Sequence, residues 1–257
     1  MPEFDAVVVG SGPNGLSAAI VLAQAGKRVI VLEAAPTVGG GARSAELTAP
    51  AFIHDICSAV HPLGVSSLFF RSLPLESHGL EWVHPRVLLA HPLDDGTAAL
   101  LEQTLEATAS GLGAHGARPD EAAYLRLMGP LVSHWDDLLD DVLRPIIHVP
   151  RHPILLGRFA VVALRSASGL ARSRFRGRHA RALFGGLAAH ATLPLNHSLT
   201  ASFGLMLAAA GHARGWPVAA GGSQAISAAL AAHLIGLGGK IECGRRVASV
   251  ADLPPAK

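Results

Sequence analysis

The chain has 257 residues, of which 50% are hydrophobic and 16% are charged, and its formal net charge at pH 7 is +2. This length allows one large domain or two small ones, and the composition excludes an intrinsically disordered chain. The two cysteines, Cys57 and Cys243, lie far apart and outside any CxxC motif. We therefore expect a reducing compartment and neither a disulfide framework nor a thiolate metal site.

The first strand is predicted to begin almost at the first methionine, which leaves no room for a signal peptide and makes a cytoplasmic location the expectation. Residues 182–239 contain a single charged residue, Arg214. Glycines and prolines interrupt this stretch repeatedly, so it is interpreted as buried helices and loops rather than a membrane-spanning helix.

Residues 4–9 form a Val-rich apolar run, typical of a parallel strand buried on both faces, and three glycines follow in GxGxxG spacing. Gly10 permits a tight strand-to-helix turn, and Gly12 lets backbone approach a pyrophosphate closely. Gly15 allows the helix to pack against the strand. A helix with small residues is predicted next, and Gly26 ends it. The amino terminus of such a helix attracts phosphate.

Residues 28–32 predict a second buried strand, with Glu33 at its end. This carboxylate lies 23 residues after Gly10, where it is placed to accept hydrogen bonds from a ribose diol. Strand, glycine turn, helix, strand and acid together predict an adenine-dinucleotide site. The motif alone is compatible with either NAD or FAD.

In the segment that follows, EAAPTVGGGARS, five residues separate Glu33 from Gly39 and Gly40, with Arg43 close by. This arrangement resembles the extended fingerprint of FAD-dependent oxidoreductases of the amine oxidase and phytoene desaturase type. The resemblance implies FAD as the cofactor, with the glycine doublet continuing the pyrophosphate cradle. Arg43 is either a phosphate partner or a solvated loop residue, and we favour the phosphate contact.

Two further stretches resemble the same family. Residues 51–64 look like the phytoene dehydrogenase-related branch, in which this segment passes near the flavin ring, so His61 becomes a weak catalytic candidate. The favoured interpretation of His61 is a loop histidine held by a hydrogen bond. Residues 215–250 resemble the family's GWPxxxGG segment and the helix after it. By that resemblance the backbone of Val247 contacts adenine, although a plain strand valine remains the alternative.

The middle of the chain has a different pattern. Short strands with a turn at 94–96 are predicted within residues 80–100, and helices from there to 215. Asp120 is the expected cap of one of these helices. The apolar run 154–170 precedes an arginine cluster, which is typical either of a helix lying on an anionic membrane surface or of a core helix with a basic loop.

Other ligand classes are disfavoured. His148 and His152 have metal-like spacing, but Pro150 lies between them and prevents a regular helical turn, so no metal site is expected. The arginine cluster is short and carries one aromatic residue, Phe175, which argues against nucleic acid.

The sequence thus predicts an α/β fold: a discontinuous Rossmann-type FAD-binding domain with a mainly helical inserted domain. The predicted FAD-binding domain comprises residues 1–100 and 215–257. Residues 101–214 are predicted to form the helical insert, which faces the substrate or a membrane. A third parallel strand is expected at 240–243 and the next short strand at 247–250. The predicted cofactor-binding residues are Gly10, Gly12, Pro13, Asn14, Gly15, Glu33, Ala34, Gly39, Gly40, Gly41, Arg43 and Val247.

The resemblance implies a flavin-dependent oxidoreductase that passes hydride from an apolar, carotenoid- or lipid-like substrate to FAD; the electron acceptor is unassigned. Members of this family are usually nearly twice as long, and no second glycine-rich segment is found before Lys257. The alternative is therefore a non-catalytic half-flavoprotein or nucleotide-binding subunit. A second chain or a homo-oligomer is expected to complete such a protein.

Overall fold

A computed structural model describes residues 3–145 and 147–256, and these divide into two structural units. Of the described residues, the first unit comprises 3–61, 69–83 and 218–256, and the second comprises 62–68, 84–145 and 147–217. The domain boundaries expected from the sequence lie elsewhere, between residues 100 and 101 and between residues 214 and 215.

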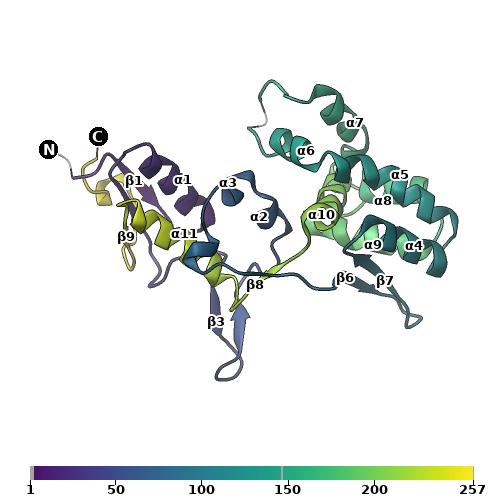
Figure 1. The fold of residues 1–257 in the computed structure, drawn as a ribbon, viewed down its shortest axis with the longest axis horizontal. Coiled ribbons are helices and arrows are strands. Elements are labelled where there is room, and N and C mark those ends of the chain that lie inside the picture. Colours follow the sequence, from purple (N-terminus) through teal and green to yellow (C-terminus); the bar gives the residue numbers. More distant parts are fainter. Residues whose placement is uncertain (1–2, 146, 257) are drawn as a thin grey trace. The chain divides into compact units, whose positions relative to one another are not determined.

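The elements of the two units alternate along the chain (Figure 1). Those of the first unit are β1 (Ala6–Val9), α1 (Pro13–Gln24), β2 (Val29–Leu32), β3 (Ser44–Glu46), β4 (Ile53–Asp55), most of α3 (Leu68–Arg71), η1 (Glu76–His78), β5 (Trp82–Val83), β8 (Val218–Ala219), α11 (Gln224–Gly236), β9 (Lys240–Glu242) and η3 (Val250–Asp252). Those of the second are α2 (Pro62–Ser66), β6 (Val87–Pro92), β7 (Ala98–Glu102), α4 (Leu105–His115), α5 (Pro119–Ser133), α6 (Trp135–Val142), α7 (Pro153–Ala163), α8 (Ala167–Arg174), α9 (Arg178–Ala188), η2 (Ala189–Ala191) and α10 (Thr200–Arg214).

The first unit is built on a parallel sheet of order β1–β2–β9. Two parallel neighbours need a crossover between them, and α1 supplies it for β1 and β2. All four residues of the central strand β2 are buried. Its odd positions, Val29 and Val31, join the core beneath α1 and α11, while Ile30 and Leu32 pack against the opposite cluster. β2 is therefore covered on both faces, as its apolar run predicted, whereas β1 is only partly buried and its Val9 is 56% exposed, so burial of that strand on both faces was wrongly predicted.

The ends of α1 agree with the prediction as well. Pro13 occupies the first helical position, where its missing N–H costs nothing. At the other end, Gly26 adopts a φ of 74° just beyond the cap residue Ala25 and donates to the Ala23 carbonyl at 2.9 Å.

The carboxyl-terminal part of the first unit differs from the prediction in one element. β9 pairs in parallel with β2, as expected for the strand at 240–243. Residues 247–249 form no strand, and η3 begins at Val250. Here Asp252 accepts the backbone N–H groups of Ala248 and Ser249, both at 2.8 Å. This capping box removes the donors that a sheet ladder would use, so the predicted strand at 247–250 is wrong.

The second unit is a helical body with one hairpin. β6 and β7 pair antiparallel around the predicted turn, which is closed by Leu93 N–H donating to the Thr97 carbonyl at 2.8 Å. α10 forms the centre of the core, because its Ala201, Leu205 and Ala208 are fully buried. No single described helix is long and apolar enough to cross a membrane. The pair α7 and α8 together meets the criteria of length and composition, but the two helices are bent by 94° relative to each other.

Asp120 has a different role from the one predicted. α5 begins at Pro119 with Arg118 at its cap, so Asp120 lies inside the helix. Its buried carboxylate accepts the backbone N–H groups of Arg176 at 2.8 Å and Gly177 at 2.7 Å. Asp120 therefore fixes the distant loop between α8 and α9, a contact that local spacing does not encode.

Candidate functional site

The predicted dinucleotide site begins with the turn from β1 to α1. Gly10 has a φ of 95° and donates its N–H to the Leu32 carbonyl at 2.8 Å, which joins the turn to the end of β2. A Cβ atom on Gly15 would lie 2.1 Å from the Gly10 carbonyl oxygen. Only glycine fits at position 15, because the first turn of α1 rests directly on the backbone of the elbow.

The glycine doublet lies against this elbow. Gly40 has a φ of 53°, and a Cβ on it would be 3.0 Å from the Cα of Gly12. Gly39 donates its N–H to the Ser11 carbonyl at 3.0 Å. The two glycine-rich segments, which the sequence separates, thus form one backbone surface without side chains.

This surface fits a diphosphate. In the described part of the chain, the backbone N–H groups of Gly12, Asn14, Gly15, Gly40 and Gly41 have no hydrogen-bond partner. Three of these belong to the amino-terminal end of α1, whose free N–H groups and dipole favour an anion. Unpaired donors that converge on a surface without Cβ atoms are what a pyrophosphate needs.

The Glu33 carboxylate connects the end of β2 to the glycine elbow. Its Oε2 accepts the Ser11 N–H at 2.8 Å and the Ser11 hydroxyl at 2.6 Å, and its Oε1 accepts the Ala35 N–H at 2.8 Å. Partial burial acts to raise the pKa of Glu33, but these hydrogen bonds and the charge of Arg43 outweigh it, so the pKa lies below its ordinary value. Glu33 is an anion with acceptor capacity left on Oε1, beside the exposed Ala34.

Arg43 is half-buried, and its Nε donates to the Gly40 carbonyl at 2.9 Å. This bond holds the arginine beside the doublet. The two terminal nitrogens of Arg43 have no partner among the described residues. The arrangement is compatible with the predicted phosphate contact, which remains a prediction.

The doublet is held in place by the amino-terminal end of α11. Gln224 donates its N–H to Ser44 Oγ and its side-chain Nε2 to the Val38 carbonyl, both at 3.0 Å. Asp55 accepts the Ser44 hydroxyl at 2.7 Å and the Ser223 N–H at 2.6 Å. The segment near residue 220 therefore positions the loop near residue 40, which explains why both belong to one unit.

His61 is fixed by hydrogen bonds in the same region. Its Nε2 lies 2.8 Å from Ser223 Oγ, whose hydroxyl donates to the Ser58 carbonyl at 2.5 Å. The serine oxygen is thus the acceptor, and His61 carries its proton on Nε2. Burial lowers the pKa of His61, with the Asp55 charge opposing that effect, so the ring is neutral at pH 7. The geometry is that of a hydrogen-bonded loop histidine, with its ring centroid 5.9 Å from that of Trp82.

Val247 packs its side chain into the small cluster of Phe4, Ile30 and Leu32. Within the described chain its backbone N–H and carbonyl have no hydrogen-bond partner. They are free to contact a ligand, although the segment is a loop rather than the expected strand.

The sequence analysis missed Ser11 and Ser223. Nothing in the sequence distinguishes Ser11 from any residue between two glycines, since its role arises from contact with Glu33. Ser223 does carry a signal, because a serine before a helix is a typical cap. In the structure no side-chain cap bond forms, and the hydroxyl serves His61 and Ser58 instead.

Comparison with known proteins agrees with this geometry. The family of NAD(P)-binding Rossmann-like domains matches residues 8–71. The chain is 61% identical over 41 residues to all-trans-retinol 13,14-reductase of Rattus norvegicus, covering 16% of this chain and 7% of that protein. It is 33% identical over 105 residues to one component of the limonene dehydrogenase of Castellaniella defragrans, covering 40% of this chain and 19% of that protein.

Among solved structures, putrescine oxidase bound to putrescine superimposes with a TM-score of 0.52 at 19% identity, covering 94% of this chain. The chain spans 51% of the length of that oxidase. The predicted α/β fold is confirmed, as is the resemblance to oxidoreductases of the amine oxidase and desaturase type. The match to the NAD(P)-binding Rossmann-like family supports a nucleotide cofactor.

Proposed function

We propose that this chain, which has the Rossmann segment and fold of the amine oxidase and desaturase-type oxidoreductases, binds FAD and takes part in the oxidation or reduction of an apolar, lipid-like substrate. The observation that carries the proposal is the packing of Gly40 on Gly12. A GxGxxG elbow alone suits NAD as well. A second glycine segment against the elbow adds donors on the other side of the diphosphate, as in the family's FAD fingerprint.

The residues present fit this cofactor. The amides of the elbow and of the doublet would hold the pyrophosphate, Glu33 the ribose diol and the backbone of Val247 the adenine. Bound flavin supplies hydride acceptance and donation at its ring. The chain's own contribution is to bind the dinucleotide end and to orient it through Glu33, Ser11 and the loop fixed by α11. His61, neutral and hydrogen-bonded to Ser223, stays a positioning residue in this proposal.

An apolar substrate is supported by the names of two relatives, a limonene dehydrogenase and a retinol reductase, since limonene and retinol are both hydrocarbon-rich molecules. Putrescine oxidase, the structural neighbour, is named for a diamine. We favour the hydrocarbon class on the names of these two relatives. Identity does not decide the class, because an L-amino-acid oxidase is 62% identical over 40 residues.

Titration of the 257-residue chain with FAD and, separately, with NADH tests the cofactor. Saturable quenching of flavin fluorescence, with FAD bound more tightly than NADH, is the expected result. Tighter binding of NADH would overturn the assignment. Anaerobic addition of retinol, a carotene or putrescine to the flavin-loaded protein then tests the substrate class. Loss of the flavin absorbance with the hydrocarbons but not with putrescine is expected, and the reverse order contradicts the apolar assignment.

A further inference from the structure

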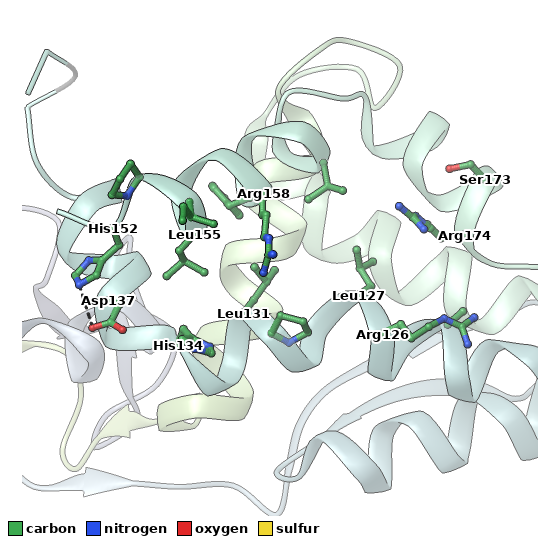
Figure 2. A pocket seen from close by; sticks show the side chains of 16 residues that line it. Arg126, Leu127, Leu131, His134, Asp137, His152, Leu155, Arg158, Ser173 and Arg174 are labelled. Carbon is green, nitrogen blue, oxygen red and sulfur yellow. Dashed lines mark ion pairs between the residues drawn. The ribbon is translucent and has the colours of Figure 1, made fainter. Parts of the chain in front are cut away.

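The second unit contains a cavity of about 710 Å³ between α5, α7 and α8 (Figure 2). This volume lies within the range of small-molecule sites, roughly 300–1,000 Å³. No part of the cavity belongs to the dinucleotide site, since all of its lining residues fall in the second unit. It is therefore a separate candidate site.

Much of the cavity wall is apolar. Leu127 and Leu131 of α5 line it together with Leu155, Phe159 and Val162 of α7. Leu131 and Phe159 are each only 6% exposed and join the core of the unit, so this wall is firmly packed. A hydrocarbon chain laid on it would exclude water from the remaining apolar surface.

Three arginines line the same cavity: Arg126 of α5, Arg158 of α7 and Arg174 of α8. Figure 2 shows Arg158 extending from α7 toward α5, with the guanidinium of Arg174 turned into the same space. Within the described residues none of the three makes an ion pair or a hydrogen bond. The carboxylate on the wall, Asp137, is 3.5 Å from His152 and pairs with that ring instead.

Not every arginine of the unit has a partner, since Arg172 on α8 has none among the described residues either. Other arginines of the unit find carboxylates: Arg144 and Arg151 pair with Asp140, and Arg178 pairs with Asp95. Three exposed guanidinium groups and one carboxylate, Asp137, therefore line the site beside an apolar wall, which leaves an excess of positive charge. A planar oxyanion is the group that matches their donor geometry.

We propose that this cavity binds an amphipathic anion: an apolar chain on the Leu127–Phe159 wall, with its carboxylate or phosphate head group held by Arg158 and Arg174 and flanked by Arg126. The inference does not depend on FAD or on the proposed function, because it concerns ligand residues of the second unit only. A free long-chain carboxylate and an anionic membrane lipid share this chemistry.

A dansyl-labelled undecanoate, used below its micelle concentration, tests the site by fluorescence titration of the full chain. Saturable binding at one site is expected. In the double variant Arg158→Gln/Arg174→Gln the affinity should fall about tenfold or more, since charged hydrogen bonds are lost. Arg172→Gln is the matched control, because Arg172 lies on α8 like Arg174 but does not line the cavity.

The outcomes separate the alternatives. If Arg172→Gln lowers the affinity for the labelled undecanoate as much as the double variant does, the attraction is a general charge effect and the proposal is overturned. The proposal is also overturned if undecanol, which lacks the carboxylate, competes as well as unlabelled undecanoate. Arg158→Lys should bind better than Arg158→Gln by retaining the charge, and circular dichroism of each variant checks the fold. An affinity of the double variant equal to that of the unchanged chain also overturns the proposal.

Vesicles of phosphatidylcholine with and without phosphatidylglycerol distinguish the two sources. A membrane lipid is the occupant if the chain sediments with the anionic vesicles, if undecanoate prevents this sedimentation, and if the double variant does not sediment. Undecanoate binding without sedimentation identifies a free amphiphile. Sedimentation that persists in the double variant and is indifferent to undecanoate places lipid elsewhere and overturns the cavity assignment.

Discussion

Gly12 and Gly40 meet backbone to backbone: a Cβ atom on Gly40 would lie 3.0 Å from the Cα of Gly12, and one on Gly12 would lie 3.7 Å from the Cα of Gly40. The two contacts differ in kind. The first is too tight for a side chain at a φ of 53°, whereas the second is ordinary van der Waals contact. This asymmetry allows ligand binding and folding to be tested at separate positions.

Replacing Gly12 by alanine should leave the fold intact, because Gly12 has a φ of −65° and room for a methyl group. The methyl would instead occupy the surface that the diphosphate approaches, so we expect FAD affinity to fall at least about tenfold, as when a charged hydrogen bond is lost. Fluorescence titration measures the affinity. Gly15→Ala is the contrasting variant: its Cβ would lie 2.1 Å from the Gly10 oxygen, so its midpoint of thermal unfolding should drop. Unchanged FAD affinity in Gly12→Ala would rule out this diphosphate position.

Glu33→Ala should affect both binding and stability. The substitution removes the ribose acceptor, and it also leaves the N–H of the fully buried Ser11 without a partner. An unpaired buried donor costs about 1–3 kcal/mol in the free energy of unfolding. Ser11→Ala, which removes only the hydroxyl, should retain most of the FAD affinity. Equal losses of affinity in the two variants would assign Glu33 to the elbow alone and not to the ribose.

The pKa of Glu33 sets the direction of a pH effect. A carboxyl whose pKa is lowered on folding stabilises the protein above its unfolded pKa of about 4.3. That stabilisation is lost as the pH falls through the lower, folded value. Denaturant titrations between pH 3 and 7 should therefore show a steeper acid loss for the unchanged chain than for Glu33→Ala.

The sequence predicts the parts of the fold in which local pattern and tertiary packing agree. The elbow, α1 and β2 belong to this class. Each glycine there occupies a backbone position that favours glycine, and each valine of β2 lies on a covered face of the sheet. The strand expected at 247–250 fails because Asp252 captures two backbone donors, a local competition that an apolar run does not reveal. The roles of Asp120 and Ser11 could not be predicted from the local sequence, because each depends on a hydrogen-bond partner more than twenty residues away.

His61 and Ser223 should behave as a structural pair. Because His61 donates from Nε2 to Ser223, His61→Leu is expected to lower the free energy of unfolding by about 1 kcal/mol. Ser223→Ala in the His61→Leu background should then cost less than it does alone, which a double-mutant cycle measures. His61→Gln, which keeps a donor, should leave the pH profile of flavin reduction unchanged. A limb of that profile that disappears in His61→Gln would show that the ring transfers protons.

Asp120→Ala should be among the more damaging changes in the second unit. Two backbone N–H groups would lose a buried, charged acceptor, and the expected cost is about 3 kcal/mol in the free energy of unfolding. Asp120→Asn keeps one acceptor oxygen and should lose less. Asp94→Ala, in the exposed hairpin turn, is the control for removing a negative charge. Urea denaturation compares the variants, and a loss in Asp94→Ala as large as that in Asp120→Ala would show that net charge, not the two bonds, is responsible.

His212 should make the second unit sensitive to mild acid. Burial lowers its pKa to about 4, and a backbone hydrogen bond at Gln103 and the Glu106 carboxylate oppose that effect. The Tyr124 hydroxyl, whose pKa burial raises, lies 2.9 Å from His212 Nε2 and donates to it, so the folded state needs a neutral ring. The unfolded histidine titrates near 6.5 and binds the proton first, so stability is lost as the pH falls from 6.5 toward 4, in total on the order of 3 kcal/mol. Urea midpoints across this range should fall for the unchanged chain and much less for His212→Gln, and parallel curves for the two proteins would exclude His212 as the group responsible.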